Sequence, residues 1–246
     1  MPKDTRVATG VPGLDEMLSG GFVPDTAVLL RGAPGCGKTL LGMQYLIHGA
    51  LNNEPGLLIS FEEFPASIHR DAESLGWDLS ELEETDQLHL MFTSPQVLLD
   101  SLATPTSALG RLMLEGGIRR VVVDSITHFT RLTSDNIKLR GYYSTIINGF
   151  KREGVTTLLL GEEGRTPNPQ QEKGKLSFVV DAILLLRYVE VESTLQRAIV
   201  VLKMRGSDHA KDIRRIEIHR GGLVVTDVFE GRENILSGIS HRAAAR

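Results

Sequence analysis

The sequence predicts an α/β fold built on a doubly wound, mainly parallel sheet, and three observations support this prediction. Short apolar runs that are typical of buried strands recur along the 246 residues, and helical stretches separate most of them. A glycine-rich loop joins the first of these strands to the first long helix. Near the C-terminus, two apolar runs meet at Gly221-Gly222, which predicts an antiparallel hairpin on the sheet edge.

The glycine-rich loop matches a complete phosphate-binding motif. Residues 32–39 read Gly-Ala-Pro-Gly-Cys-Gly-Lys-Thr, which fits the pattern G-x-x-x-x-G-K-[ST]. A strand is predicted over 26–31, and apolar residues at helical spacing predict a helix over 38–50. The free N–H groups and positive dipole end of such a helix can hold phosphates. Nucleotide contacts are therefore predicted for nine consecutive residues: Gly32, Ala33, Pro34, Gly35, Cys36, Gly37, Lys38, Thr39 and Leu40.

Two oxygen ligands for magnesium are predicted beside this loop. Lys38 would reach the β- and γ-phosphates, and the hydroxyl of Thr39 would bind the metal. The strand predicted over 120–124 is an apolar run that ends in Asp124, the Walker B arrangement, and this carboxylate would hold magnesium through water. The predicted cofactors are therefore ATP and Mg²⁺.

A pair of carboxylates follows the strand predicted over 57–61. Glu62 and Glu63 come at its carboxyl end, where open α/β sheets place ligand chemistry. One of them can orient or deprotonate the attacking group while the other tunes its pKa. A solvated acidic turn is the alternative interpretation. A catalytic role is favoured because Asp124 is followed by Ser125 and not by a glutamate, so the base must come from elsewhere.

The remaining elements follow in chain order. An amphipathic stripe predicts a helix over 137–152. The strand-like run that precedes the hairpin leads into Lys203, Arg205 and His209, a segment that by itself is as typical of a solvated turn as of a functional site. Further strands are predicted over 88–92, 155–160, 182–186 and 197–202.

Composition limits the class of protein. The formal net charge is −4, from 27 basic and 31 acidic residues, and no basic stripe favours constitutive binding to duplex DNA. The single cysteine, Cys36, lies in the loop as a small filler and indicates a reducing compartment. No apolar run approaches the roughly 20 residues of a membrane helix, so we expect a cytoplasmic protein. We expect one domain with its core at about 9–230 and a loosely held tail at about 231–246.

The histidines show no ligand spacing. They are scattered along the chain, and we expect them to be ordinary surface or core residues. No metal site formed by protein ligands alone is predicted. Four of the seven scattered histidines are His48, His69, His89 and His128.

These motifs together resemble the KaiC group of RecA-like ATPases. The match includes the opening at 9–16, the phosphate loop, Phe61-Glu62-Glu63, the segment 122–125 and Lys203-Met204-Arg205-Gly206-Ser207, and it extends from about Thr9 to Gly238. From Leu184 onward the chain is most similar to the second of the two ATPase repeats found in the clock proteins of this group. It has one repeat, as the stand-alone members do.

The resemblance implies a ring of RecA-like subunits, usually a hexamer, with ATP between neighbours. It implies that Glu62 is the general base with Glu63 beside it. It also implies that Lys203, Arg205, Ser207 and His209 approach the ATP of the adjacent subunit. The serine-threonine pair that is autophosphorylated in the second clock repeat corresponds here to Ser177-Phe178. Because the threonine is absent, the resemblance does not extend to a two-step phosphorylation cycle, and the partner-binding elements of a clock role are not recognisable.

Three functions remain open at this point. The first is an ATP-hydrolysing ring, with or without phosphorylation of its own Ser177. The second is a nucleotide-dependent interaction switch whose slow hydrolysis times its assembly with an unidentified protein partner. The third is a recombinase-like ATPase stimulated by nucleic acid, which the acidic balance and the absence of a basic or aromatic-rich strand-binding segment oppose.

Overall fold

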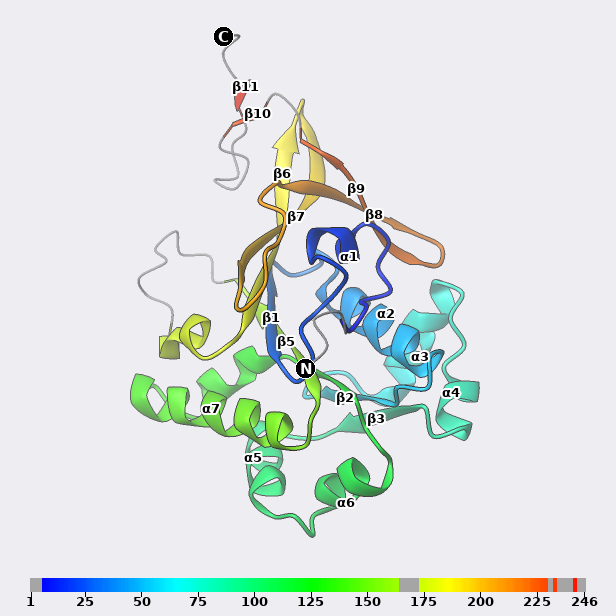
Figure 1. The fold of residues 1–246 in the computed structure, drawn as a ribbon, viewed down its shortest axis with the longest axis vertical. Coiled ribbons are helices and arrows are strands. Elements are labelled where there is room, and N and C mark those ends of the chain that lie inside the picture. Colours follow the sequence, from blue (N-terminus) through cyan, green and yellow to red (C-terminus); the bar gives the residue numbers. More distant parts are fainter. Residues whose placement is uncertain (1–5, 164–172, 230–231, 234–240, 243–246) are drawn as a thin grey trace.

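The computed structural model describes residues 6–163, 173–229, 232–233 and 241–242. These residues form a nine-stranded sheet in the order β3-β2-β4-β5-β1-β6-β7-β8-β9 (Figure 1). The first six strands in this order are parallel, and the last three are antiparallel. The strands are β1 Ala27–Gly32, β2 Gly56–Ser60, β3 Leu88–Phe92, β4 Arg120–Asp124, β5 Thr156–Glu162, β6 Ala182–Val191, β7 Thr194–Met204, β8 Arg214–His219 and β9 Gly222–Val228.

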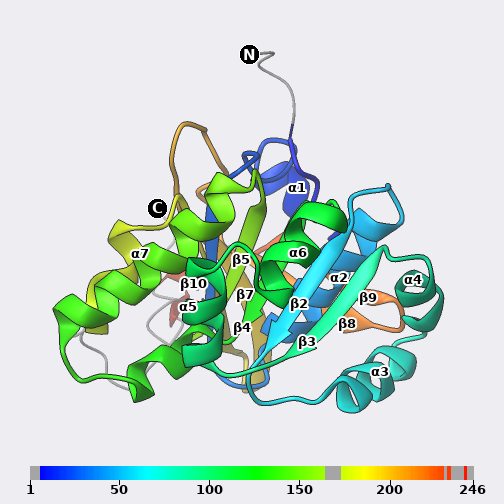
Figure 2. The ribbon, with the colours of Figure 1, turned by 90° about the horizontal axis from the view of Figure 1, so that it is seen from below.

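Helices cover both faces of the sheet, as Figure 2 shows for the face that carries α7. In β1, Val28 and Leu30 face one apolar core while Ala27 and Leu29 face the other, because successive side chains of a strand point to opposite sides. Helices α1, α2 and α3 pack on the first core, and α5, α6 and α7 pack on the second. The helices are α1 Leu14–Met17, α2 Lys38–Ala50, α3 Pro65–Ser74, α4 Ser80–Glu84, α5 Pro95–Ala103, α6 Ala108–Glu115 and α7 Asn136–Arg152, with 3-10 helices η1 Ile126–Arg131 and η3 Lys173–Phe178.

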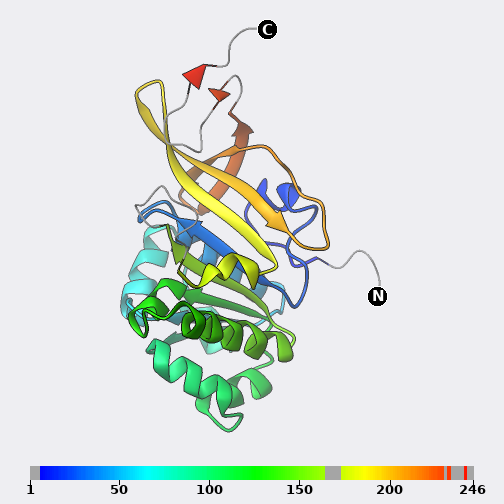
Figure 3. The ribbon, with the colours of Figure 1, turned by 90° about the vertical axis from the view of Figure 1, so that its left-hand side faces the viewer.

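The predicted fold class is confirmed, with one refinement in the antiparallel part. Only Glu192 and Ser193 connect β6 to β7, which is too short for the crossover that a parallel pair needs. These strands therefore form a long antiparallel hairpin that projects beyond the parallel strands (Figure 3). The antiparallel region thus begins before the predicted β8–β9 hairpin, and β6 and β7 are longer than predicted.

The apolar residues that follow Ser177 do not form a strand, since η3 extends to Phe178 and β6 begins only at Ala182. The carbonyl groups of Ser177 and Val180 both accept hydrogen bonds from the Nζ atom of Lys203, at 2.8 and 2.7 Å.

The C-terminal tail is only partly described. β10 (Arg232–Glu233) pairs antiparallel with β11 (His241–Arg242). The remaining residues of the tail predicted over 231–246 lie outside the described residues, so that prediction stays open. In the described part of the chain, no helix has the length and apolar composition required to span a bilayer.

The sheet has two functionally distinct edges. In the parallel register Ser60 pairs with Asp124, Asp124 with Leu160, and Leu160 with Leu30, so β2, β4, β5 and β1 end close to one level. We call this the carboxyl edge, and the opposite end of the parallel strands the amino edge. In Figure 2 the carboxyl edge lies below, and the loop after β7 lies above, at the amino edge.

Candidate nucleotide-binding site

The predicted phosphate loop connects β1 to α2 at the carboxyl edge. Gly35 and Gly37 have φ angles of +75° and +105°, in the left-handed region that favours glycine. Gly37 precedes α2 and no side chain caps this helix end, so its first N–H groups face outward for an anion. The side chain of Cys36 is buried and its burial raises the pKa of the thiol, which agrees with the prediction of a small filler.

Three carbonyl oxygens of this loop are held by hydrogen bonds. The Nζ atom of Lys38 donates to Gly32 O at 3.0 Å and to Ala33 O at 2.9 Å. The hydroxyl of Tyr188, on β6, donates to Gly35 O at 2.6 Å. Arg197 of β7 lies over the ring of Tyr188, 5.4 Å from its centroid. The β6–β7 hairpin therefore supports the loop, a contact that the sequence pattern did not predict.

The two predicted magnesium ligands lie together. The hydroxyl of Thr39 donates to Asp124 Oδ2 at 2.7 Å. Burial raises the pKa of the Asp124 carboxyl, and the hydrogen bond from Thr39 and the nearby charge of Lys38 oppose this rise. A hydroxyl and a carboxylate are hard oxygen donors, which fit Mg²⁺ when phosphate oxygens and water complete its shell. The described residues contain no group of three or more His, Cys, Asp or Glu side chains placed to hold a metal ion.

Both predicted glutamates follow β2 at the same edge. Glu62 Oε1 lies 3.0 Å from His128 Nε2 and 3.3 Å from Arg131 Nη2. The backbone N–H of Glu63 donates to Ser60 Oγ at 3.0 Å. The pKa of the Glu63 carboxyl is raised, first by burial and then by the neighbouring negative charges, of which Asp124 is the strongest.

Sequence reasoning missed the partners of Glu62. His128 was expected to be an ordinary histidine, yet its side chain is buried and contacts the carboxylate that the resemblance identifies as the base. His128 and Arg131 belong to η1, which follows β4 directly. Their position soon after the strand that ends in Asp124 is the signal that would have found them, because a short helix there stays at the carboxyl edge.

The remaining predicted residues do not lie near the phosphate loop of their own chain. In the sheet register Lys203 pairs with Ile183 and Met204 with Ala182, at the start of β6. The N–H of Arg205 donates to Asp181 O, and that of Asp181 donates to Ala27 O, at the start of β1. Ala27 and Gly32 are five residues apart, which at about 3.3 Å per residue corresponds to roughly 16 Å. Lys203 and Arg205 therefore lie at the amino edge.

The neighbours of Arg205 share this position. Its Nη2 atom donates to Phe178 O at 2.9 Å, which places η3, with Ser177, at the amino edge as well. Burial and the charge of Arg205 lower the pKa of Lys203. Ser207 and His209 continue the same loop, where Ser207 Oγ accepts from Arg6 at 2.7 Å and His209 Nδ1 lies 2.8 Å from Ala210 O.

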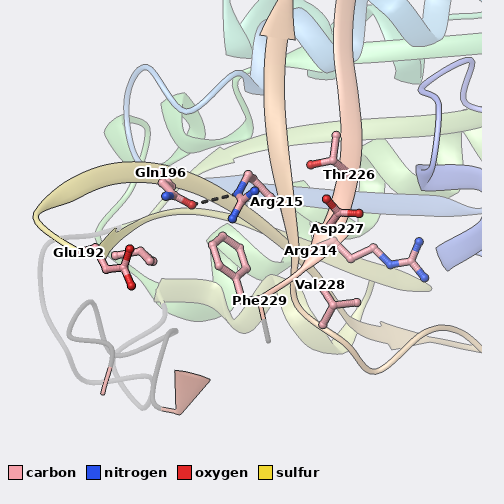
Figure 4. Close-up of a pocket in the computed structure, with 9 residues that line it drawn as sticks. Glu192, Gln196, Arg214, Arg215, Thr226, Asp227, Val228 and Phe229 are labelled. Carbon is pink, nitrogen blue, oxygen red and sulfur yellow. Dashed lines mark hydrogen bonds between the residues drawn. The ribbon is translucent and has the colours of Figure 1, made fainter. Parts of the chain in front are cut away.

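A cavity of about 730 Å³ lies elsewhere, between the tip of the β6–β7 hairpin and the start of β8 (Figure 4). Within it, Arg215 Nε donates to Gln196 Oε1 at 2.9 Å, and the guanidinium lies 5.3 Å from the ring centroid of Phe229. None of its lining residues belongs to the phosphate loop or the glutamate pair. The lining residues are Val191, Glu192, Gln196, Arg214, Arg215, Thr226, Asp227, Val228 and Phe229.

Comparisons with known proteins identify the family of this chain. The family model described as "ATPase: KaiC" matches residues 7–229. Similar proteins include the circadian clock oscillator protein KaiC of Nostoc sp., 34% identical over 98% of this chain and 46% of its own length. The protein of the same name from Thermostichus vulcanus is 35% identical over 97% of this chain and 46% of its own length. The chain thus spans about half the length of the curated relatives it matches. Because the family model matches most of the chain and the sheet has the expected α/β order, the chain belongs to the KaiC family of RecA-like ATPases.

Proposed function

We propose that this chain hydrolyses Mg-ATP at the contacts between identical subunits of a ring, which the family resemblance suggests is a hexamer. Membership of an ATPase family supports ATP as the substrate. The placement of the phosphate loop at the carboxyl edge and of Lys203 and Arg205 at the amino edge supports an ATP site between two subunits. The relatives named for a circadian clock are about twice as long as this chain, and we do not extend that role to it.

Residues of the carboxyl edge would bind the nucleotide. The N–H groups at the start of α2 and the Nζ atom of Lys38 would contact the phosphates, and Thr39 and Asp124 would hold the metal ion. Bound magnesium supplies positive charge to the β- and γ-phosphate oxygens. Glu62 would accept a proton from the attacking water. Glu63 beside it would supply a second carboxyl group, whose pKa is raised by burial.

The observation that carries the proposal is the separation of the two sets of charged residues. The carboxylates and the phosphate loop lie at the carboxyl edge, whereas Lys203 and Arg205 lie at the amino edge, about five strand residues away. These cations cannot reach their own phosphate loop without breaking the sheet. A second subunit whose amino edge faces the first subunit's carboxyl edge would bring them to the γ-phosphate.

One observation favours a second candidate, a nucleotide-dependent switch with very slow hydrolysis. The side chain of Glu62 already contacts His128 and Arg131 through Oε1. A carboxylate oxygen that already contacts two donors must give up one of these contacts before it can take a proton from water, which favours slow turnover. The turnover number per subunit of the assembled protein separates the two candidates.

Tyr188→Phe tests the support of the phosphate loop. Removing the hydroxyl frees the Gly35 carbonyl and lets the loop rearrange. A net loss of about 1 kcal/mol corresponds to roughly fivefold weaker binding of ATP and ADP. Fluorescent-nucleotide titration measures this, and Tyr142→Phe on α7 is the matched control. Equal affinities of the wild type and Tyr188→Phe would show that the hydrogen bond does not shape the loop.

Glu62→Gln keeps the side chain's size and removes the base. We expect ATP binding to persist and phosphate release to fall about a hundredfold or more, the range for a lost general base. Glu63→Gln, measured in parallel, should reduce the rate less. If the order of the two effects is reversed, Glu63 is the base.

Arg205→Ala tests the contribution of a neighbouring subunit. The variant should bind ATP almost normally but hydrolyse it poorly, since a supplied arginine is typically worth about 10³ to 10⁵ in rate. Mixed with Lys38→Ala subunits, it should regain partial activity, because some interfaces then pair an intact loop with an intact arginine. Sizing of the mixture first establishes that the two variants assemble together. Full hydrolysis by an Arg205→Ala monomer contradicts this role.

Ser177 is the proposed phosphate acceptor. It lies at the amino edge with Lys203 and Arg205, so the γ-phosphoryl group of a neighbour's ATP would pass to Ser177 Oγ, leaving ADP. Incubation with Mg-ATP should add the mass of one phosphate to the intact protein, and Ser177→Ala should abolish the addition. No added mass at any ATP concentration would exclude the autokinase activity and leave the ATPase.

A further inference from the structure

An exposed pair of aromatic rings lies beside the glutamates of the carboxyl edge. Phe64 and Phe92, which we call the aromatic pair, stack with ring centroids 4.2 Å apart. Phe64 precedes α3 and is 61% exposed, and Phe92 ends β3 and is 41% exposed. Large apolar side chains that adjoin one another on a surface mark an interaction site more often than isolated ones do.

Carboxylates surround the aromatic pair. Glu62 and Glu63 immediately precede Phe64, and both have exposed side chains. Ser60 of β2 pairs with Phe92 on one side and with Asp124 on the other, so only β2 separates the strand that ends in Phe92 from the strand that ends in the predicted metal ligand. This surface is therefore apolar at its centre, and where it adjoins the candidate site it carries Glu62 and Glu63, with Arg131 paired to Glu62 at 3.3 Å.

The amino edge carries a surface of the opposite charge. Phe178 is 57% exposed and Leu202 is 50% exposed. Leu202 precedes Lys203 in β7, and the carbonyl of Phe178 accepts a hydrogen bond from Arg205 at 2.9 Å. We call these four residues the amino-edge patch. Like the aromatic pair with its glutamates, the patch combines apolar side chains with charge, here positive.

We propose that the aromatic pair is a docking site for the amino-edge patch of a second copy of this chain. The inference rests on the proposed function, in which Lys203 and Arg205 serve a neighbour. It adds the apolar contact that would hold the neighbour in place: Phe178 and Leu202 pack on Phe64 and Phe92. The cations then enter beside the carboxylates, so both the apolar surfaces and the charges are complementary.

The charges select a head-to-tail contact over a two-fold one. Two aromatic pairs packed against each other would bring Glu62 and Glu63 of both copies together, and such like-charge contacts oppose association. When the aromatic pair of one subunit packs on the amino-edge patch of the next, each subunit uses one surface for each of its two neighbours, and all subunits point the same way around. A contact of this type generates a closed ring when its rotation permits.

Disulfide trapping tests the proposed neighbours. In a Cys36→Ser background, which removes the only native thiol, we introduce Phe64→Cys in one preparation and Phe178→Cys in another. Mixed with Mg-ATP and a mild oxidant, the two should form disulfide-linked dimers, whereas each preparation alone should not. Leu202→Cys in place of Phe178→Cys provides a second pairing, and Ile137→Cys, exposed on α7, provides the matched control.

Sizing with Mg-ATP separates this inference from the proposed function. We expect the wild type to assemble and the Phe64→Ser/Phe92→Ser double variant to remain monomeric, with thermal melting to establish that it is folded. Leu114→Ser/Ile137→Ser, which removes exposed apolar side chains elsewhere, should assemble like the wild type. Assembly of both the wild type and the Cys36→Ser background without trapping at either pairing would overturn the inference and leave the ring. No assembly of the wild type would overturn both.

Discussion

The parallel register of β1, β4 and β2 is the constraint on which the candidate site depends. Parallel strands that start and end at similar levels place the loops after them side by side. That is why three segments far apart in the sequence, namely the phosphate loop, Asp124 and Glu62-Glu63, occupy one edge. A one-residue slip of β4 would still bury valines on both faces of the sheet, but it would move Asp124 away from Thr39.

Burial of polar groups at this edge links nucleotide binding to the core. Asp124 and Lys38 are mostly removed from water, and each is satisfied by a partner from another element or from the loop. Ion binding would favour the charged form of Asp124, because a nearby cation offsets the loss of hydration. In the structure Thr39 and Lys38 supply part of that compensation, so the site is held close to a shape suited to binding.

Under the proposed function, a neighbouring subunit would complete the nucleotide site. The cavity of about 730 Å³ lies at the β6–β7 hairpin tip, away from the phosphate loop. An interfacial nucleotide site needs no enclosed cavity in one subunit, since the neighbour would provide its outer wall. Lys203 and Arg205 donate to carbonyl groups of residues 177–180 because the sheet places them at the amino edge, away from the phosphate loop of their own chain.

The sequence by itself determined the fold class, the β1–loop–α2 unit and the acidic strand ends, because apolar periodicity and the glycine-rich motif are local signals. The limits of β3, β4 and α2 agree with the predicted ones for the same reason. Tertiary structure alone decided which residues meet across the sheet. Tyr188 reaches Gly35, and His128 reaches Glu62, through strand pairing and the path of η1, which no local pattern encodes. The opposite positions of Lys203 and the phosphate loop likewise follow from sheet register, a property of the whole fold.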